Sequence, residues 1–435
     1  MVDQCRRLRT FVPRSVPGQT MPNEVTAEII SIGDELLIGQ TLNTNAAWMG
    51  EQLSLAGIRP VRVRMIGDDR REIMEALATA VGDVVLLTGG LGPTKDDITK
   101  HVLCEFFDTT LVRHPEIEER IASFFQSIGR EPLEVNRAQA DLPASCIVVP
   151  NDRGTASGMW FAREGKVYVS MPGVPYEMKR MMRDYVVPRL VEHFAPPTIV
   201  HRTILTTGLG ESHLAERIAH WENSLAAEGI KLAYLPSPGL VKLRLSAYAD
   251  NRPRDARTSV DRKAEELYAL IPELIFAEGE DRIEAVIGAM LKERRQTLSL
   301  AESCTGGYVS HLITSIPGSS AYYIGGVVSY ANAVKMEELG ISSDMLELNG
   351  AVSQPVVERM ATGVRTALRT DWSIALSGVA GPDGGTEDKP VGTVWMAVAG
   401  PDGVRSTCIY LPGSRDLVIK RSAIAALDLL RKRLS

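Results

Sequence analysis

The sequence predicts an α/β protein of two or three domains, each large enough to bury its own core. From residue 27 onward, apolar strand-like runs alternate with amphipathic helical segments. This alternation is typical of parallel sheets that helices cover on both faces. Glycine-rich turns directly follow several of the predicted strands, at the sheet edge where such proteins bind ligands. The length of 435 residues exceeds what one core usually organises.

Composition and charge narrow the class of protein. The chain is 44% hydrophobic and 23% charged, which is typical of a folded globular protein. A formal net charge of −6 argues against nucleic acid as the main ligand. The five cysteines are scattered and never form Cys-x-x-Cys, which fits a reducing compartment and no structural zinc. No apolar run approaches the ~18 residues of a membrane span. We therefore expect a cytoplasmic protein without membrane or nucleic-acid partners, and we also expect it to form a homodimer.

The first 24 residues differ from the rest of the chain. They contain Arg6, Arg7, Arg9 and Arg14 together with three prolines, but no apolar core of a signal peptide. We expect a disordered extension over residues 1–24, or a true start at Met21. A targeting segment is the alternative.

The first domain is predicted over residues 25–195. Its opening half alternates strand and helix, over residues 27–32, 44–56, 59–65, 71–81 and 84–88. Short connections between such units predict parallel strands, with the ligand site beyond their carboxyl ends.

Two candidate binding motifs lie at those strand ends. Gly89, Gly90 and Gly92 follow the third strand, and a glycine-rich turn before a helix can cradle a phosphate. The turn is not a Walker A loop, because Gly-Lys-Ser/Thr is absent. Nearby carboxylates offer the hard oxygen ligands that magnesium takes beside substrate phosphates, namely Asp34, Glu35, Asp96 and Asp97. The alternative is that Asp34 caps a helix and that Asp96 and Asp97 are favourable charges in a first helical turn.

Residues 27–180 resemble the molybdopterin-binding, MoaB/MogA-like fold as it occurs in the N-terminal domain of the competence/damage-inducible CinA family. The resemblance rests on Asn43 to Asn45 and on residues 136–140, 150–158 and 171–178. It implies hydrolysis of ADP-ribose with a divalent metal, magnesium being the first candidate, at Asp34, Asp96 and Asp97. It also implies substrate contacts from Gly89, Gly90, Gly92, Thr94 and Asn45. The chain departs from the family pattern in the loop expected to contact substrate, at Asp152, Arg153 and Ser157.

Pro196 and Pro197 mark a linker into a small α+β unit predicted over residues 196–277. Strands are expected at 202–207, 231–234, 240–249 and 274–277, with helices at 211–220 and 258–270. The unit resembles the KH-type connecting domain of the longer CinA proteins. It lacks the Gly-x-x-Gly loop through which KH modules bind RNA, so we expect a structural bridge.

The C-terminal domain, predicted over residues 278–435, contains the strongest candidate site. Residues 297–301 are predicted to form a strand and the segment from residue 308 a helix, so Ser303 lies on the turn between them. Gly306 and Gly307 allow the backbone to approach a ligand closely. The start of the helix is expected to offer unpaired N–H groups to an anion or an oxyanion. Tyr330 follows Ser303 by 27 residues, and Lys335 comes five residues later.

A serine needs a neighbouring base to become a nucleophile, and a desolvated lysine can be that base. Ser303, Tyr330 and Lys335 therefore form a workable acyl-transfer set that needs no histidine. The alternative is a helix-capping serine, a surface lysine and a core tyrosine. Cys304 is the rival nucleophile, because a thiolate at the start of a helix is activated too.

A second glycine-rich loop, at residues 378–385, follows a strand predicted at 373–377. Its N–H groups can wrap a phosphate, with Thr386 adding a hydroxyl. The alternative is a long hairpin loop before a strand at 392–399. Helices at 282–293 and 354–367 complete the α/β pattern of this domain.

Residues 301–307, 330–335 and 377–386 resemble the C-terminal domain of the CinA family, a nicotinamide-nucleotide amidohydrolase with a Ser/Tyr/Lys catalytic set. The resemblance implies deamidation of nicotinamide mononucleotide without a cofactor, with Ser303, Tyr330 and Lys335 catalytic. It implies substrate binding by Thr305, Gly306, Gly307, Gly381, Gly384, Gly385, Thr386 and Arg415. The family usually carries a second arginine four residues after Arg415, where this chain has Ile419. Lys420 or Arg421 must then supply that cation, or it is missing.

These observations predict a bifunctional hydrolase of pyridine-nucleotide salvage whose partners are small nucleotides, nicotinamide mononucleotide and ADP-ribose. Two alternatives remain open. One is a non-catalytic nucleotide sensor that acts through partner proteins, and the other is a molybdopterin-binding protein.

Overall fold

The structure is a computed structural model that describes residues 24–94, 97–248 and 253–435. The predicted N-terminal extension up to residue 23 and the predicted metal ligand Asp96 lie outside the described residues. The chain divides into two compact units, one ending at Ile199 and the other beginning at Val200, and each is described by itself. No helix in the described part of the chain is both long enough and apolar enough to cross a membrane.

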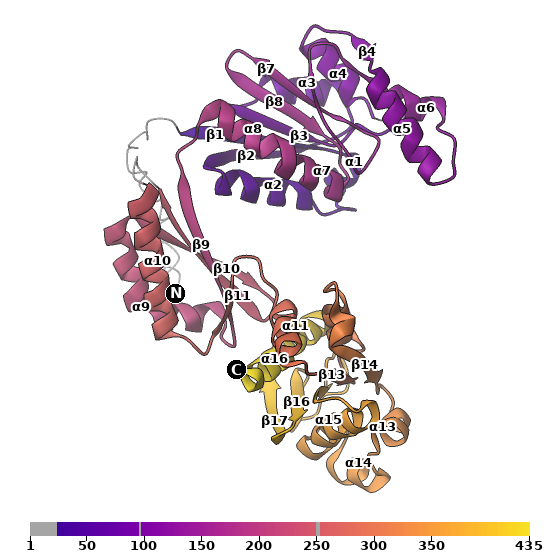
Figure 1. The fold of residues 1–435 in the computed structure, drawn as a ribbon, viewed down its shortest axis with the longest axis vertical. Coiled ribbons are helices and arrows are strands. Elements are labelled where there is room, and N and C mark those ends of the chain that lie inside the picture. Colours follow the sequence, from indigo (N-terminus) through magenta and orange to yellow (C-terminus); the bar gives the residue numbers. More distant parts are fainter. Residues whose placement is uncertain (1–23, 95–96, 249–252) are drawn as a thin grey trace, which may run out of the picture. The chain divides into compact units, whose positions relative to one another are not determined.

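The first unit is built on a six-stranded sheet with the order β2-β1-β3-β8-β7-β6. Its strands are β1 (Val25–Ile32), β2 (Ile58–Ile66), β3 (Val84–Thr88), β6 (Ile147–Val149), β7 (Gly158–Arg163) and β8 (Lys166–Met171). Figure 1 labels β1, β2, β3, β7 and β8 of this sheet. The predicted parallel pairing holds for β2, β1, β3 and β8, whereas β7 and β6 are antiparallel. Only a tight turn, with Glu164 and Gly165 at positive φ, joins β7 to β8. So short a connection permits only an antiparallel pair.

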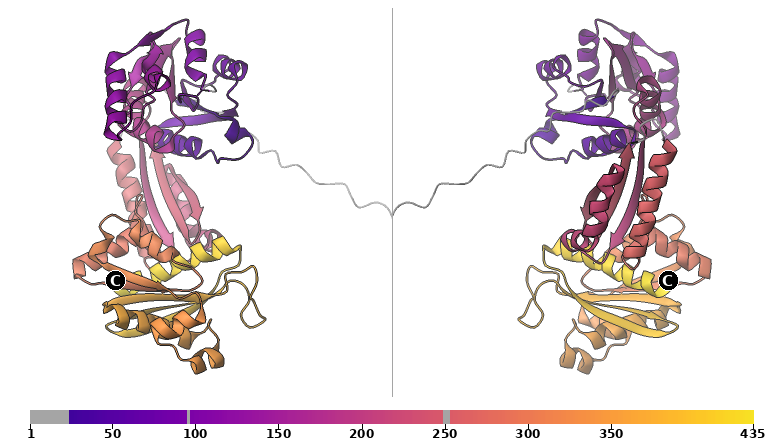
Figure 2. Two further views of the ribbon diagram at one scale, coloured as in Figure 1. Left: turned by 90° about the vertical axis from the view of Figure 1, so that its right-hand side faces the viewer. Right: turned by 90° about the vertical axis from the view of Figure 1, so that its left-hand side faces the viewer.

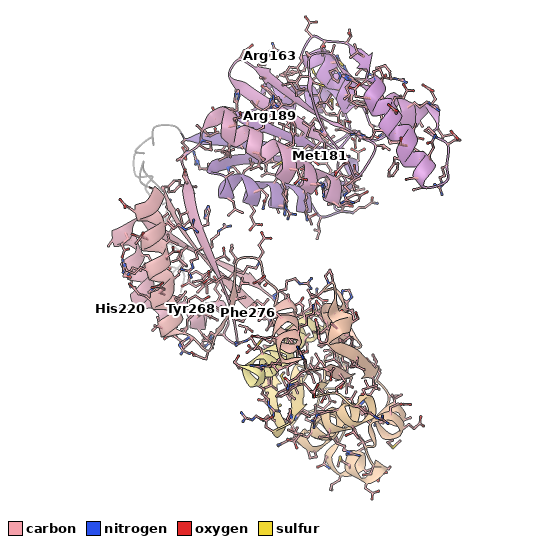
Figure 3. All side chains as sticks on the ribbon, viewed as in Figure 1. Arg163, Met181, Arg189, His220, Tyr268 and Phe276 are labelled. Atoms are coloured by element: carbon pink, nitrogen blue, oxygen red, sulfur yellow. The ribbon has the colours of Figure 1, made fainter. Side chains whose placement is uncertain are left out.

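Helices cover both faces of this sheet. One face carries α2 (Thr44–Leu55), α7 (Pro175–Met181) and α8 (Val187–Phe194), and the other carries α3 (Arg70–Ala78), α4 (Thr99–Phe106) and α5 (Pro115–Ser127). Consecutive side chains of β1 pack on opposite faces of the sheet, since Ile29 and Ile30 are both fully buried, each in a different core. Figure 3 labels Met181 of α7, which belongs to the first of these cores. The remaining elements are α1 (Asp34–Leu37), α6 (Glu134–Arg137), a 3-10 turn (Ala138–Ala140), a π-helical turn (Met182–Val186), and the two-stranded sheet β4 (Leu111–Arg113) with β5 (Asp141–Pro143).

The second unit begins with the predicted connector. A four-stranded sheet with the order β10-β11-β9-β12 contains β9 (Ile199–Thr207), β10 (Ile230–Ser237), β11 (Leu240–Tyr248) and β12 (Ile275–Glu278). The helices α9 (Glu211–Leu225) and α10 (Pro253–Leu270) pack with it around one core, to which Ile218, Leu243 and Leu267 contribute. Figure 3 labels Tyr268 of α10 and Phe276 of β12. This strand and helix order agrees with the predicted α+β unit.

The rest of the second unit is a five-stranded sheet with the order β14-β13-β15-β16-β17. The first three strands are parallel and the last two antiparallel, over β13 (Leu298–Glu302), β14 (Tyr323–Val328), β15 (Trp372–Gly378), β16 (Thr393–Gly400) and β17 (Gly403–Tyr410). One face packs on α11 (Ile283–Arg294), α12 (Tyr308–Thr314) and α16 (Arg415–Leu434), and the other on α13 (Asn332–Leu339), α14 (Ser343–Asn349) and α15 (Gln354–Leu368).

The long helix α16 also contacts the connector, as the yellow helix in Figure 2 shows. A Cβ atom on Gly239 would lie 3.0 Å from Cβ of Ile424, and the Arg431 side chain donates to the Glu273 carbonyl oxygen. The C-terminal sheet is therefore attached to the connector by packing as well as by the chain.

The loops singled out in the sequence leave the carboxyl ends of parallel strands. In the C-terminal sheet, the turn at Ser303 follows β13, Ser329 follows β14 and the loop from Val379 follows β15. In the first unit, Gly33 follows β1 and Gly89 follows β3. Carboxyl ends of parallel strands share one edge of a sheet, so each set of loops converges on a possible ligand site.

Candidate active site

Ser303 and Lys335 lie within hydrogen-bonding distance of each other. The Ser303 N–H donates to the Leu376 carbonyl oxygen at 3.0 Å, which holds the turn against β15. Lys335, on α13, is only 1% exposed. Its Nζ lies 3.2 Å from Ser303 Oγ and donates to the carbonyl oxygens of Ser329 (2.7 Å) and Tyr330 (3.4 Å). The fold thus joins a hydroxyl and an amine that are 32 residues apart in sequence.

The surroundings of Lys335 suit a base. Burial lowers the pKa of its amine below the ordinary value of 10.5, and the nearby Cys304 thiol only partly offsets that shift. Desolvation disfavours the charged form of a lysine, so a larger share of the amine is neutral near neutral pH. A neutral amine beside a hydroxyl can accept its proton.

Cys304 is poorly placed to compete as the nucleophile. Its side chain is 5% exposed and packs in the core beneath the turn. Burial raises the pKa of its thiol to about 12, and the thiol form is a weak nucleophile. Ser303 is half-buried and faces Lys335, so the geometry favours the serine.

The structure places Tyr330 with Arg415 rather than with the Ser303 hydroxyl. The Tyr330 side chain is 61% exposed, and its hydroxyl accepts a hydrogen bond from Arg415 Nη2 at 2.7 Å. Arg415 Nη1 donates to the Gly381 carbonyl oxygen at 2.8 Å. Among the described residues, the Tyr330 hydroxyl makes no hydrogen bond to Ser303 or Lys335. Three predicted site residues from distant segments therefore meet beside the pair, but not as the expected triad.

The loop that contains Gly381 is a hairpin loop and also part of the site. It joins the antiparallel strands β15 and β16, while the Arg415 contact ties it to Tyr330. Gly381 has φ 82°, and a Cβ there would lie 2.5 Å from a Val391 methyl group, so only glycine fits. Gly384, Gly385 and Thr386 are exposed on the same loop. The Thr386 hydroxyl accepts from the Lys389 N–H at 3.1 Å.

Both candidates for a second cation already have partners. Lys420 Nζ pairs with Asp416 at 2.7 Å, and Arg421 donates to the Pro412 carbonyl oxygen at 3.1 Å. Arg415 is therefore the cation that the structure joins to Tyr330 and the glycine-rich loop.

The predicted free N–H groups at the start of α12 are occupied, and this expectation was wrong. The Glu302 carboxylate accepts from the N–H groups of Gly307 (3.1 Å), Val309 (3.0 Å) and Ser310 (2.8 Å). It also accepts from the hydroxyls of Thr305 (2.7 Å) and Ser310 (2.6 Å). The hydroxyl of Thr305, predicted to bind substrate, therefore donates to Glu302 instead. Of the turn's N–H groups, those of Cys304 and Thr305 donate to no other residue in the described chain.

The role of Glu302 was not predicted, because functions in this segment were assigned to the serine, the cysteine and the glycines that follow it. The signal was present, since Thr305 and Ser310 follow it at distances that a turn into a helix brings back to the strand end. A buried carboxylate requires donors, and the sequence offers two hydroxyls close by.

A carboxylate pair lies at the edge of the first sheet. Asp34 N–H donates to Asp68 Oδ2 at 3.2 Å, and Asp68 N–H donates to Asp34 Oδ1 at 3.3 Å. Burial raises the pKa of Asp68, and the negative charges of Asp34, Glu35 and Asp97 raise it further, against the Asp34 N–H that stabilises the carboxylate. Asp68 was not predicted, because it follows the edge strand β2 without a glycine-rich motif. Within the described residues, no three His, Cys, Asp or Glu side chains form a metal-binding group.

The glycines after β3 are required by close packing. A Cβ on Gly89 would lie 2.1 Å from the Ile32 carbonyl oxygen, and one on Gly90 would lie 2.1 Å from Thr99 Oγ1. A Cβ on Gly92 would lie 2.5 Å from an oxygen of Asp97, the carboxylate that closes this loop.

Thr94 and Asn45 also hold positions at this edge. The Thr94 N–H donates to Asp97 Oδ2 at 2.9 Å, and its hydroxyl donates to the same oxygen. The Asn45 side-chain amide donates to the Gly173 carbonyl oxygen at 2.7 Å, while its own oxygen is buried without a partner among the described residues. That oxygen remains available as an acceptor.

The three departures from the family pattern are accommodated locally. Ser157 is 2% exposed, and its hydroxyl accepts from Arg120 at 2.8 Å. Asp152 pairs with Arg180 at 3.1 Å, and the Arg153 N–H donates to Asn151 Oδ1 at 3.1 Å. Each of the three residues in this loop therefore has a hydrogen-bond or ion-pair partner.

Family models match the three parts of the chain in order. Residues 28–192 match a probable molybdopterin binding domain, residues 201–277 a damage-inducible protein CinA KH domain, and residues 280–434 a CinA C-terminal domain. A CinA-like protein of Cytophaga hutchinsonii is 42% identical over 416 residues, which are 95% of this chain and 99% of that protein. The chain belongs to the CinA family. A CinA-like protein of Flavobacterium psychrophilum, also 42% identical, covers 93% of this chain and 98% of its own length.

Two solved structures align with parts of the chain. A competence/damage-inducible protein of Agrobacterium tumefaciens is 33% identical and covers 34% of this chain and 92% of its own, with a TM-score of 0.34. A CinA protein of Thermoplasma acidophilum is 34% identical and covers 37% of this chain and 96% of its own, with a TM-score of 0.35.

Proposed function

We propose that the C-terminal domain of this CinA protein deamidates nicotinamide mononucleotide to nicotinate mononucleotide and ammonia. The observation that carries the proposal is the buried Lys335 amine 3.2 Å from the Ser303 hydroxyl. Ser303 Oγ attacks the carboxamide carbon while Lys335 Nζ takes the hydroxyl proton. Lys335 returns this proton to the leaving ammonia as the carbon–nitrogen bond breaks. Water then cleaves the nicotinoyl ester on Ser303, releasing nicotinate mononucleotide and the free hydroxyl.

The oxyanion that forms on the carboxamide oxygen needs donors. The N–H groups of Cys304 and Thr305 are next to Ser303 and donate to no other described residue, whereas those of Gly307, Val309 and Ser310 are committed to Glu302. We assign oxyanion stabilisation to the former pair. A donor aimed at developing charge acts most strongly in a site that excludes water.

Arg415 is the proposed phosphate ligand, supported by its contacts with Tyr330 and Gly381 at the site. Tyr330 then acts as a positioning residue for Arg415. A guanidinium held by a hydroxyl and a carbonyl keeps donors free for a phosphate and loses less freedom on binding.

Arg415→Ala is expected to raise KM for nicotinamide mononucleotide about tenfold to a hundredfold, since a charge-assisted contact contributes ~1.5–3 kcal/mol. The KM for free nicotinamide, which has no phosphate, should change much less. Tyr330→Phe should act in the same direction but more weakly, with kcat nearly unchanged. Steady-state ammonia release on both substrates checks this, with the exposed Arg294→Ala as a matched control. Equal losses on both substrates would show that Arg415 is structural.

For the N-terminal domain we propose metal-dependent hydrolysis of ADP-ribose. Magnesium commonly takes only one or two protein carboxylates beside water and substrate phosphates, so the Asp34 and Asp68 carboxylates fit it. The like charges that raise the pKa of Asp68 are a repulsion that a bound cation relieves. Asp34 and Asp68 would hold the ion, with Asp97 as a third candidate. When bound, the metal neutralises phosphate oxygens and activates water.

Asp97→Asn is expected to lower ADP-ribose hydrolysis at least about tenfold, a loss typical even for an outer-shell partner of a metal. Deamidation should be unchanged, because the C-terminal site is built only from residues of the second unit. Asp68→Asn should weaken binding of manganese or magnesium in calorimetric titration of the protein alone. Asp108→Asn is the matched control, since Asp108 has φ 49° and asparagine also adopts that conformation. A hydrolysis rate that chelator does not change would contradict the metal assignment.

A molybdopterin ligand is the second candidate for the first domain, favoured by the family-model match over residues 28–192. A pterin that copurifies with the protein, seen by its fluorescence after oxidation, would support this candidate over hydrolysis. Catalytically silent pure protein would instead support the nucleotide-sensor alternative.

A further inference from the structure

The Glu302 carboxylate is the most heavily hydrogen-bonded group near the candidate active site, and the proposed chemistry does not use it. It is 1% exposed and accepts five hydrogen bonds, three from backbone N–H groups and two from hydroxyls. All five donors belong to the segment that follows Ser303. A buried charge with this many donors organises them, because each donor would otherwise lose its partner.

Glu302 also links this segment to the base. Its carbonyl oxygen accepts the Ser329 N–H at 2.8 Å, and the Ser329 carbonyl oxygen accepts Lys335 Nζ at 2.7 Å. Glu302 therefore contacts both sides of the Ser303–Lys335 pair. Its side chain holds the segment that follows Ser303, and its backbone carbonyl oxygen holds Ser329, which in turn accepts from Lys335. Only the side-chain half of this arrangement depends on the identity of residue 302.

The chemistry of the group is specific. A carboxylate only accepts hydrogen bonds, which matches five donors, whereas the carboxamide of glutamine presents an NH2 group. In Glu302→Gln that NH2 group would oppose either the N–H groups of Gly307 and Val309 or that of Ser310. The turn would have to rearrange, while the volume of the side chain stays the same.

We propose that Glu302 is a positioning residue, which holds the Ser303 turn so that Ser303 Oγ faces the Lys335 amine. The inference rests on the proposed amidohydrolase function. The contacts of Glu302 also occupy the N–H groups at the start of α12, so these groups cannot bind substrate. The phosphate must then bind elsewhere, at Arg415 and the glycine-rich loop.

Glu302→Gln is expected to lower kcat for deamidation about tenfold to a hundredfold, the size of one or two lost hydrogen bonds to a charged group, with KM changed less than about twofold. Glu284→Gln is the matched control, because Glu284, on α11, is an equally buried glutamate (3% exposed) of the same domain and pairs with Arg282. Formate or acetate should restore part of the kcat of Glu302→Ala by replacing the missing carboxylate. Glu302→Gln with wild-type kcat, or equal losses in both glutamine variants, overturns the proposal.

A second measurement does not depend on the substrate. The rate at which a fluorophosphonate labels Ser303, mapped by peptide mass spectrometry, should fall at least about tenfold in Glu302→Gln and stay at the wild-type value in Glu284→Gln. If Glu302→Gln does not fold, Ser310→Ala, which removes one of the two hydroxyl donors, should show a smaller loss in the same direction. Labelling without ammonia release by the wild-type protein would contradict the proposed substrate and leave Glu302 supported. Unchanged labelling in the folded variant, or no labelling of wild-type Ser303, overturns the inference.

Discussion

Ser303→Ala is expected to abolish deamidation of nicotinamide mononucleotide, with kcat falling at least about 10³-fold, while the nucleotide still binds nearly as tightly. In the proposed mechanism this hydroxyl forms the covalent bond, and no other described nucleophile lies within hydrogen-bonding distance of Lys335 Nζ. Ammonia release measures the loss, and calorimetric titration with the nucleotide measures the retained binding. A trapped nicotinoyl group should map to Ser303 by mass spectrometry.

Cys304→Ala is the matched control for that result. Because burial raises the pKa of the Cys304 thiol to about 12, its removal should leave substantial activity, reduced only by looser packing beneath the turn. An inactive but folded Cys304→Ala protein beside an active Ser303→Ala protein would reverse the assignment of the nucleophile.

Lys335→Met is expected to be almost as severe as Ser303→Ala, because it removes the proposed base and keeps much of the side-chain volume. General-base catalysis typically contributes 10²- to 10⁴-fold, so kcat should fall by about that factor. The double variant should be little worse than either single one, since residues that act as a unit give non-additive losses. Full additivity of the two losses would mean that Lys335 does not act on the Ser303 proton.

The pH dependence should identify Lys335 as the base. Its pKa is lowered by burial, and protonation removes the base, so kcat/KM should fall as the pH drops through that lowered value.

The stability of the folded protein should also depend on the pH through Lys335. Between the lowered folded-state pKa and the ordinary 10.5, the unfolded chain binds more protons, so stability rises with pH in that window. Thermal unfolding of Lys335→Met should lack this contribution.

The local sequence was sufficient to predict the fold class and many of the elements, although none between α3 and β9 except β3. Strand β3 was predicted at its observed bounds, residues 84–88, because a short uninterrupted apolar run that ends at glycines is typical of a strand buried on both faces. Helix α15 was predicted to within a residue from its apolar periodicity. Strands β6, β7 and β17 were not predicted, and the antiparallel pairing that they make depends on which connections are short.

The sequence by itself also determined the candidate nucleophile and base, since a serine on a predicted strand-to-helix turn and a lysine at the spacing of the CinA family are features of the sequence. Only the tertiary structure decided that Lys335 Nζ lies 3.2 Å from Ser303 Oγ, because that distance depends on the parallel pairing of β13 with β14. It likewise decided that Tyr330 serves Arg415, that Asp68 joins Asp34, and that Glu302 occupies the N–H groups expected to be free. The physical reason is shared: residue type limits which chemistry a side chain can perform, but hydrogen bonds and burial depend on neighbours that are distant in sequence.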